Sequence, residues 1–503
     1  MIKGINVIPK IQVKDEQTLA VIYTPGVAAA SEKIAENKDL SFDYTNRENT
    51  VGVFAYDYSK ALKRAIFLKL ALGIDAVPFQ INSDSPDDIK SVIENLEPSF
   101  GAADLSLISE AAEKTDFSVS IPVLKGKTDN LKEFFLCVSK NIFPFDINKL
   151  EGTCGEKSLF VRKLAGGSVE TELTEKEHVK PVGIITEGSA VLGLGNIGAY
   201  AALPVMEGKA VLFYSLAGLS ALPVCIKTQK PDEFVKIVSL IKNSFSAINL
   251  EDIAAPDCFE TEKKLSEILD IPVFHDDAHG TSVVVLAGLI NALKVVNKKI
   301  EDVKIVMSGA GAAGFTVANL LIDYGAKNIV VCDRNGAINR DEVYSKPNHI
   351  ALSKSTNPFN EKGSLKEVIK NADVFIGVSA PNLLNEDDIK KMNKNAIVFA
   401  LANPVPEIMP DIAETAGAEV VSSGRSDFKN QINNCLVFPG IFKGFLKFKI
   451  KKVTSEIKIN CAKALAGVIT EDRLSKDCII PKALDRTAAK AVAESVGLNK
   501  TDF

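Results

Sequence analysis

The sequence has 503 residues, of which 46% are hydrophobic and 24% charged, and its formal net charge is −5. This length predicts two to four domains with sizeable cores. The acidic balance argues against nucleic-acid or anionic-membrane partners, and no apolar run reaches the roughly 18–20 residues of a membrane span. The N-terminus lacks a secretory apolar core, and the eight scattered cysteines form no CxxC pair. We therefore expect a cytoplasmic protein with reduced thiols, most of them in the core.

The N-terminal half contains an internal repeat. A stretch of 35 residues starting at Ala71 matches a stretch starting at Leu216 without a gap. Gly73, Pro78, Pro86 and Phe100 fall on Gly218, Pro223, Pro231 and Phe245, each 145 residues later (218 − 73). We predict two copies of one α/β unit, although two βα units that share only a pattern are an alternative. Because the first copy has Ser106-Leu107 where the second has Glu251-Asp252, we expect it to have lost the chemistry and to be structural or regulatory.

Two carboxylate pairs in the second copy follow apolar stretches that are typical of buried strands, namely Glu251-Asp252 and Asp276-Asp277. Buried acids are costly unless a positive charge meets them. Oxygen ligands without cysteine suit a hard cation, Mg²⁺ or Mn²⁺. His275 and His279 have the four-residue spacing of a zinc pair, but the intervening residues do not form the HExxH pattern. We interpret the histidines either as helix-start residues or as residues that support the acids without binding the metal.

A nucleotide-binding fingerprint follows the acids. Residues 303–307 are predicted to form a strand, and the glycine turn after it leads into a helix over 315–324. Such a turn brings backbone N–H groups close to a pyrophosphate. The predicted cofactor-binding residues of the turn are Gly309, Ala310, Gly311, Ala312, Ala313 and Gly314.

Asp333 ends the next predicted strand, residues 327–332, where an acid can bond a ribose 2′-hydroxyl and favour NAD. Arg334, Arg340 and Lys346 lie nearby and could instead accept the 2′-phosphate of NADP. The choice between NAD and NADP is open at this stage.

The remaining pattern in the second half predicts a doubly wound parallel sheet. Residues 281–298 have helical apolar spacing, and further strands are expected at 373–378, 396–401 and 418–421. Residues 441–503 are typical of polar-faced helices. The fold class is thus α/β, with an N-terminal α/β substrate domain that contains a degenerate duplication, followed by a Rossmann domain.

Other positions have both an ordinary and a functional interpretation. A second glycine motif, Gly193–Gly198, lacks a matching acid and is interpreted as a tight turn near the active site. Lys209 is a surface charge or a base beside a metal. Tyr23 is a packing residue before a Pro-Gly turn or a proton donor. Asn403 and Asn434 are turn residues or contacts to a polar ligand.

We expect the following division of the chain: residues 1–50, an N-terminal segment with Tyr23; 51–142, the first copy; 143–180, a connector; 181–280, the second, catalytic copy with the metal site; 281–440, the Rossmann NAD(P)-binding domain; and 441–503, C-terminal helices.

Taken as an ordered set, several motifs resemble the malic enzymes, most closely the short prokaryotic-type form. The resemblance covers residues 20–50 and 182–445. The motifs are YTPGVA from Tyr23, GSAVLGLGNIG from Gly188, PVMEGKA from Pro204, INLEDI from Ile248, IPVFHDD-x-HGT from Ile271, GAGAAG from Gly309, ANPVPEI from Ala402 and GRSDFKNQINN from Gly424.

The resemblance implies oxidative decarboxylation of (S)-malate to pyruvate and CO₂, with reduction of NAD(P) and dependence on Mg²⁺ or Mn²⁺. It implies a small dicarboxylate as substrate and a homodimer as the assembly. The implied roles are a proton donor for Tyr23, a proton acceptor for Lys209, a residue assisting that base for Asp276, metal ligands for Glu251, Asp252 and Asp277, and substrate contacts for Asn403 and Asn434, with Asn403 also near the nicotinamide.

The chain departs from the family pattern in two places. About 130 residues, including the first copy, separate Val51-Gly52-Val53 from the motif that resumes at Thr186, and Glu187 replaces the usual aspartate. The insertion raises the question of whether Tyr23 reaches Lys209 in its own chain. Two alternatives stay open: a non-decarboxylating hydroxy-acid or amino-acid dehydrogenase, and a catalytically silent metabolite sensor.

Overall fold

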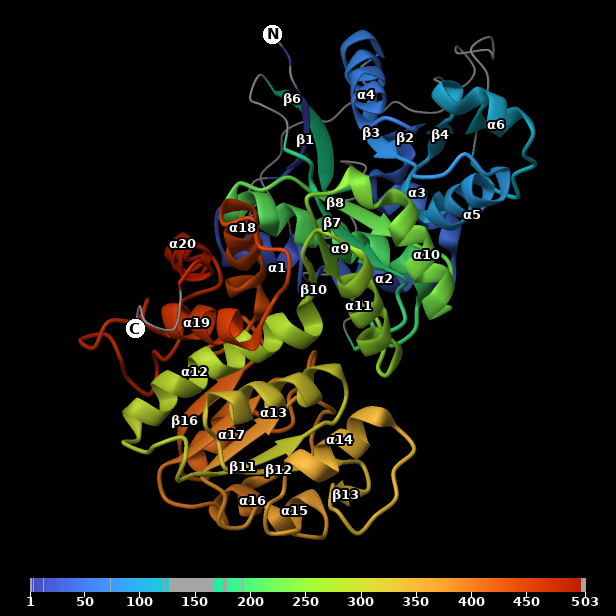
Figure 1. Ribbon diagram of the computed structural model, residues 1–503. Coiled ribbons are helices and arrows are strands. Elements are labelled where there is room, and N and C mark those ends of the chain that lie inside the picture. The colour runs from blue at the N-terminus through green and yellow to red at the C-terminus, as the bar shows by residue number, and fades with distance from the viewer. Residues whose placement is uncertain are drawn as a thin grey trace. The chain divides into compact units, whose positions relative to one another are not determined.

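A computed structural model describes residues 2–125, 167–174 and 179–498, apart from Lys3, Gln12, Gly73, Pro122 and Leu192. Most of the connector expected over residues 143–180 lies outside the described residues, as do Cys137 and Cys154. The chain divides into two compact units (Figure 1). The first contains residues 1–253 and 260–274, and the second contains residues 254–259 and 275–503.

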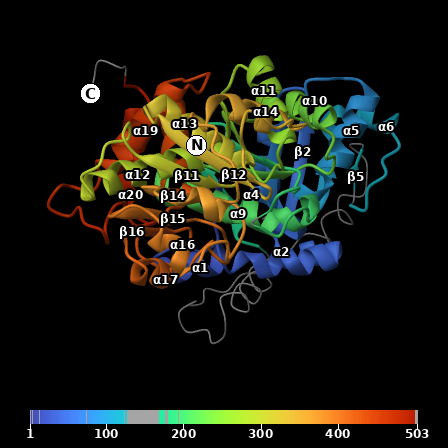
Figure 2. The same cartoon turned by 90° about the horizontal axis from the view of Figure 1, so that it is seen from below.

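The first unit begins with a segment that packs on the long helix α9 (Gly198–Ala217). Its strand β1 (Gly4–Pro9) pairs antiparallel with β6 (Val169–Thr174), and α2 lies along α9 (Figure 2). Asp15 caps α1 by accepting the Thr18 N–H at 2.7 Å. After β1 the segment contains α1 (Glu16–Ile22), α2 (Val27–Glu36), η1 (Lys38–Leu40), α3 (Ser41–Tyr44) and η2 (Asn46–Asn49).

The first copy of the repeat is a four-stranded sheet with the strand order β3-β2-β4-β5. Strand β2 pairs in parallel with β3 and β4, and β4 pairs in parallel with β5. In chain order its elements are β2 (Thr50–Ala55), α4 (Tyr58–Leu72), β3 (Asp75–Gln80), α5 (Pro86–Leu96), η3 (Glu97–Ser99), β4 (Ala102–Asp104), η4 (Ser106–Ile108), α6 (Ser109–Glu113) and β5 (Val123–Leu124).

The second copy repeats this arrangement with the strand order β8-β7-β9-β10. Helix α5 and helix α10 have the same length of 11 residues and begin 145 residues apart (231 − 86). The matching order and register confirm the predicted internal repeat. The elements are β7 (Val182–Thr186), α9, β8 (Ala221–Cys225), α10 (Pro231–Ile241), η6 (Lys242–Ser244), β9 (Ala247–Leu250), α11 (Asp257–Ile268) and β10 (Val273–His275).

The two copies also share a packing detail that requires glycine. A Cβ atom on Gly52 would lie 3.0 Å from the Phe100 ring, and one on Gly183 would lie 3.0 Å from the Phe245 ring. In each copy the phenylalanine ring therefore covers the first strand at a residue without a side chain. The same close contact in both copies is what a repeated unit predicts.

The second unit contains a six-stranded sheet with the order β13-β12-β11-β14-β15-β16. Its strands are parallel except for β13, which pairs antiparallel with β12. The predicted parallel sheet is therefore confirmed for five strands, and the short edge strand β13 differs from it. Helices α12 (Thr281–Val295) and α13 (Ala312–Tyr324) lie on one face, and α15 (Leu365–Val368) and α16 (Glu386–Lys390) lie on the other (Figure 1). The strands are β11 (Lys304–Ser308), β12 (Asn328–Asp333), β13 (Gly336–Ala337), β14 (Val374–Gly377), β15 (Ala396–Ala400) and β16 (Ala418–Ser423).

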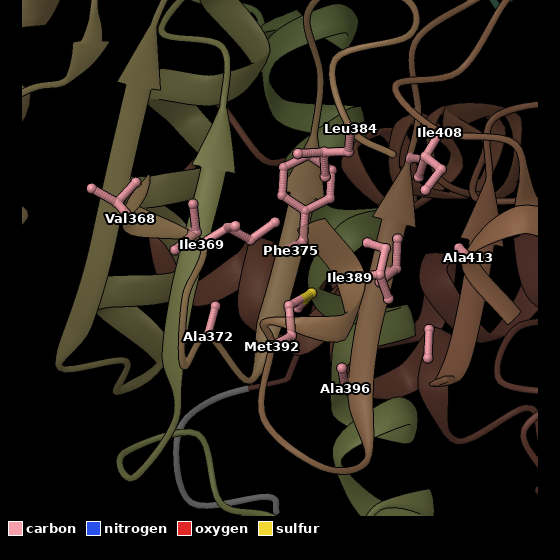
Figure 3. Close-up of a cluster of buried hydrophobic side chains, with 14 of the residues drawn as sticks. Val368, Ile369, Ala372, Phe375, Leu384, Ile389, Met392, Ala396, Ile408 and Ala413 are labelled. Carbon is pink, nitrogen blue, oxygen red and sulfur yellow. The ribbon is translucent and has the colours of Figure 1, made fainter. Parts of the chain in front are cut away.

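Helices complete the second unit and enclose its core. Side chains from the sheet and from α15 and α16 form a buried hydrophobic cluster around Phe375 (Figure 3). Burial of this kind stabilises a sheet by roughly 25 cal/mol per Å² of apolar surface. The helices are η7 (Asp276–Gly280), α12 (Thr281–Val295), α13 (Ala312–Tyr324), α14 (Pro347–Ser355), α15 (Leu365–Val368), α16 (Glu386–Lys390), α17 (Pro410–Thr415), η8 (Asn434–Leu436), α18 (Phe438–Lys447), α19 (Ser455–Ala466) and α20 (Arg486–Ser495).

Among the described residues, one helical stretch, Asp276–Val295, is long and apolar enough to cross a membrane by composition. Of its most apolar window, 72% is buried inside the protein, as is usual for the core helix of a globular unit. Of the six described cysteines, all but Cys478 are buried, which confirms the expected core positions.

Candidate active site

Helix α9 carries Lys209 into the interior of the first unit. The Lys209 side chain is 3% exposed, and its Nζ atom donates a hydrogen bond to the Glu251 carboxylate at the end of β9. The other carboxylate oxygen of Glu251 accepts a hydrogen bond of 2.6 Å from the Asn249 side chain. A buried ion pair is tolerated only when its charges are matched in this way. Lys209 is thus not a surface lysine.

Tyr23 lies beside the same helix in the same chain. It ends α1 and is buried. A Cβ atom added to Gly208 would lie 2.8 Å from Cδ2 of the Tyr23 ring. The ring therefore packs on the α9 backbone at the residue before Lys209, and only glycine leaves room for it there. Tyr23 and Lys209 thus belong to the same unit of one chain, and a direct approach of the two side chains stays a prediction.

Helix α9 also contains a buried acid that the sequence reasoning missed. Glu207 accepts hydrogen bonds from the Asn46 N–H at 2.5 Å and from the Ser168 N–H at 2.9 Å. These bonds connect α9 to η2 and to the start of β6. The acid has the position two residues before Lys209 in PVMEGKA, but its partners are distant in sequence, so local patterns could not reveal them.

Asp252 has an unusual backbone conformation. Its φ angle is 53°, in the left-handed region, and the residue is buried. Its carbonyl accepts the Ala190 N–H at 2.9 Å, which ties the acid pair to the turn before α9. Non-glycine residues with positive φ are uncommon and are concentrated at functional sites.

Glu187, which replaces the aspartate usual in the family, directly precedes the turn between Gly188 and Gly198. Glu187 is buried and accepts a hydrogen bond from the Ser189 hydroxyl. Gly193, Gly195 and Gly198 all have positive φ angles, between 75° and 78°. These conformations confirm the predicted tight turn and explain why three glycines occur there.

In the second unit, Asp276 and Asn434 are brought together. The Asn434 side-chain amide donates to Oδ2 of Asp276 at 2.6 Å. Asp276 begins the π-turn η7, a distortion that is frequent at functional sites. A Cβ atom on Gly280 would lie 1.9 Å from Oδ1 of Asp276, so glycine is needed to make room for this carboxylate.

The two histidines near these acids have separate partners. Nε2 of His275 lies 3.6 Å from the Asp277 carboxylate, and Nδ1 of His279 lies 3.3 Å from Nζ of Lys458. His275 directly precedes η7. Both therefore occur where the helix starts, as interpreted from the sequence.

The three predicted metal ligands are divided between the units. Glu251 and Asp252 belong to the first unit and Asp277 to the second. Within the described ranges, no group of three or more His, Cys, Asp or Glu side chains has an arrangement that could hold a metal ion. The donor chemistry fits a hard divalent cation, because Glu251 and Asp252 are buried carboxylates with oxygen donors. Their assembly with Asp277 around one ion stays a prediction.

The first residues of the glycine fingerprint, Gly309 to Gly311, line a large pocket in the second unit. Gly309 has a φ angle of 114°, and a Cβ atom there would lie 2.8 Å from the Val378 carbonyl oxygen. A Cβ atom on Gly314 would lie 1.9 Å from the Gly309 carbonyl oxygen. No atom lies within 4 Å of the equivalent point on Gly311, which is the position that faces open space.

The sequence predicts that the helix begins at Phe315, but helix α13 begins at Ala312. The fingerprint thus already contains the first helical turn, because Gly311 precedes it in an extended conformation. The free N–H groups of such a turn can bind a phosphate. The pocket, of about 940 Å³, is lined by Ser308, Gly309, Ala310, Gly311, Asp333, Arg334, Lys346, Asn348, His349, Lys366 and Ser379, among others.

Asp333 stands at the end of β12 among several cations. It accepts the Asn335 N–H at 2.7 Å, and Nε2 of His349 lies 3.4 Å from its other oxygen. Burial lowers the pKa of His349 below its ordinary value, although Asp333 opposes this shift. Arg334 and Lys346 line the pocket, whereas the Arg340 guanidinium bonds the Pro358 carbonyl at 2.8 Å. Arg340 is therefore the weakest of the three candidates for a 2′-phosphate.

Asn403 and a second missed acid lie beyond β15. Asn403 is exposed, and a Cβ atom on Gly424 would lie 2.8 Å from its side-chain nitrogen. Glu407 is buried and accepts the Ser379 N–H at 2.9 Å and the Ala402 N–H at 3.0 Å. Burial raises the pKa of Glu407, although these N–H groups oppose the shift. Glu407 thus joins the loops after β14 and β15, one of which lines the pocket.

Two family models match the chain. Residues 151–266 match the malic enzyme N-terminal domain, and residues 278–499 match the malic enzyme NAD binding domain. Neither match includes the first copy.

Relatives with known names agree with these matches. An NAD-dependent malic enzyme of Geobacillus stearothermophilus is 53% identical over 63% of this chain and 66% of its own length. A bifunctional malic/malolactic enzyme of Bacillus subtilis is 50% identical over 63% of this chain and 77% of its own length. The match thus spans just under two thirds of the first relative.

Among solved structures, the NAD-dependent malic enzyme of Thermotoga maritima is 33% identical, with a TM-score of 0.60 and coverage of 97% of this chain and 94% of its own. Together with the family models, this similarity extends over both units. The chain belongs to the malic enzyme family.

Proposed function

We propose that this protein catalyses the oxidative decarboxylation of (S)-malate to pyruvate and CO₂, with reduction of NAD(P). The observation that carries the proposal is the placement of Lys209 and Tyr23 in one unit. Lys209 is buried against Glu251, and Tyr23 packs one residue away on the same helix. A site with one basic and one acidic group in a water-poor interior suits a reaction that first removes a proton and later returns one.

In its neutral form, Lys209 accepts the proton of the C2 hydroxyl while a hydride leaves C2 for the nicotinamide. After CO₂ is lost from the oxidised product, Tyr23 donates a proton to C3. Asp276 assists the base, and its orientation is fixed by the 2.6 Å hydrogen bond from Asn434. Asn434 and Asn403 contact the substrate, and Asn403 also lies near the nicotinamide.

Glu251, Asp252 and Asp277 would hold a divalent cation, Mg²⁺ or Mn²⁺. When bound, this cation supplies Lewis-acid polarisation of the substrate oxygens. The donor chemistry supports this role, because Glu251 and Asp252 are buried carboxylates directly after β9, and oxygen donors suit a hard divalent cation.

The fingerprint from Gly309 to Gly314 would hold the pyrophosphate of the nicotinamide cofactor, which when bound would supply the hydride acceptor. We propose NAD as the better cofactor, because Asp333 lines the pocket at the end of β12, where a carboxylate favours a ribose 2′-hydroxyl. The family resemblance further supports a homodimer, and the scattered reduced thiols support a cytoplasmic location.

A steady-state assay tests the proposal. Malate-dependent reduction of NAD and of NADP is measured with Mn²⁺, with and without a chelator, together with pyruvate and CO₂. We expect turnover that the chelator abolishes and a higher kcat/KM with NAD. Reduction without CO₂, insensitive to the chelator, would indicate a non-decarboxylating dehydrogenase, and no turnover with intact binding would indicate a metabolite sensor.

A further inference from the structure

The two copies contact each other through reciprocal backbone hydrogen bonds. The Asn82 N–H in the first copy donates to the Leu240 carbonyl in the second at 2.8 Å. The Lys227 N–H in the second copy donates to the Asn95 carbonyl in the first at 3.0 Å. Asn82 and Lys227 are equivalent positions of the repeat, and so are Asn95 and Leu240 (227 − 82 and 240 − 95, both 145). Exchanging the copies therefore converts one bond into the other.

A second pair of contacts obeys the same rule. The Cys225 N–H donates to the Ser99 hydroxyl at 2.9 Å, and the Gln80 N–H donates to the Ser244 hydroxyl at 2.8 Å. Gln80 is equivalent to Cys225, and Ser99 to Ser244, again at a separation of 145 (225 − 80 and 244 − 99).

Whole elements follow the same pattern. Strand β3 contacts η6 and strand β8 contacts η3, while α5 and α10 contact each other. Two identical subunits related by a two-fold axis form an interface of this kind: residue i of one subunit contacts residue j of the other, and residue j of the first contacts residue i of the second. Here the two copies of the repeat, which belong to one chain, form such an interface.

We propose that the first copy acts as a built-in partner, occupying on the second copy the surface on which another copy of the same unit would dock in a two-fold dimer. The surface is formed by β8, α10 and η6. In this chain it is covered from within, so a homodimer of whole chains uses a different surface. The inference concerns assembly and does not rest on the proposed reaction.

The first copy lacks the catalytic-type side chains of the second, as expected for a copy that serves only as a structural partner. By the same register Arg64 stands where the second copy has Lys209, and Ser106 stands where it has Glu251. Arg64 Nε lies 2.8 Å from the Asp104 carboxylate, which is fully buried. Because an arginine keeps its charge at all ordinary pH values, this ion pair fills the position without a base or a metal ligand.

Cross-linking of the whole chain tests the proposal. Two double variants are prepared, Asn82→Cys with Leu240→Cys and its repeat equivalent, Asn95→Cys with Lys227→Cys. Each is treated with a short bis-maleimide and analysed under denaturing conditions, followed by mass spectrometry of the linked peptides. The single variants and the wild-type chain, whose described cysteines are mostly buried, are the controls.

We expect both pairs to link within one chain, leaving its mass that of a monomer. Linked dimers would overturn the proposal, because the copies would then pair between chains. Linking of only one pair would also overturn it, because the interface would not be two-fold.

Hydrogen exchange on the unmodified chain gives an independent readout in case a variant misfolds. The amides of Asn82 and Lys227 should exchange slowly and at comparable rates, since both donate across the interface. Rapid exchange at either position would contradict the proposal.

Discussion

The two copies of the repeat share a scaffold and differ in a few side chains at its centre. Both have four strands in the same order, and their helices α5 and α10 coincide residue by residue. At the centre, the second copy pairs Lys209 with Glu251, whereas the first pairs Arg64 with Asp104. The α/β unit thus supplies positions, and the chemistry depends on which residues fill them.

Exchange of the two cations, Lys209 and Arg64, should have the largest effect and tests whether the two copies differ in role. Lys209→Arg should lower kcat by at least about 10³-fold, because a guanidinium cannot accept a proton and general base catalysis contributes roughly 10²–10⁴-fold. Arg64→Lys in the first copy is the matched control and should leave kcat within about two-fold of wild type, since no proton transfer is assigned there. Steady-state kinetics on both variants decides the matter. Similar losses in the two would mean that the copies do not differ in role.

Tyr23→Phe is expected to have the second-largest effect. The ring still fills the space beside Gly208, but the phenolic proton is lost, so kcat should fall by roughly 10²-fold with the fold intact. Tyr58 at the start of α4 provides a control in the first copy: its phenylalanine variant should retain activity. Unchanged pyruvate formation by Tyr23→Phe would remove this residue from the mechanism.

Acid should weaken the contact between the copies through Glu97. Burial alone would raise the pKa of Glu97, but hydrogen bonds from Lys227 and Ser120 outweigh it and lower the pKa to about 2. Lys227 belongs to the second copy and lies 2.6 Å from Glu97. A lowered folded-state pKa means that the stabilisation is complete above the ordinary value of 4.5 and is lost as pH falls from 4.5 toward about 2.

Urea unfolding between pH 6 and pH 3 measures this acid dependence. Glu97→Gln should be less stable than wild type at pH 6 and should lose less stability on acidification. A parallel pH dependence in the variant and wild type would show that Glu97 does not carry the effect.

The smallest expected effects are two losses of stability that test whether the contacts between the copies are equivalent. Ser99→Ala and Ser244→Ala each remove a hydroxyl that accepts a backbone N–H of the other copy. Each should reduce the free energy of unfolding by about 1 kcal/mol, the typical contribution of one hydrogen bond. Denaturant titrations should give similar values for the two. A large loss in one variant and none in the other would mean that the contacts are not equivalent.

Local patterns in the sequence predicted much of the fold. Apolar runs bounded by turns located β11, β12, β14, β15 and β16, and the fixed offset of glycine, proline and phenylalanine located both copies. The sequence predicts the start of α13 three residues late, because the glycines favour a turn up to Gly314, whereas Gly314 lies inside the first helical turn.

Contacts between distant residues could not be predicted. The burial of Glu207 depends on an N–H group 161 residues away, and that of Glu407 on two loops that meet only in the folded sheet. The motifs gave the identities of the candidate site residues. They did not give the pairing of Lys209 with Glu251 or of Asp276 with Asn434, because register in space is set by tertiary packing.

The most direct test of the account is the stoichiometry of a single reaction: the amounts of NADH, pyruvate and CO₂ formed from (S)-malate by the whole chain with Mn²⁺. If the protein oxidatively decarboxylates (S)-malate, the three products form in equal amounts. Formation of NADH with oxaloacetate and without CO₂ would contradict it.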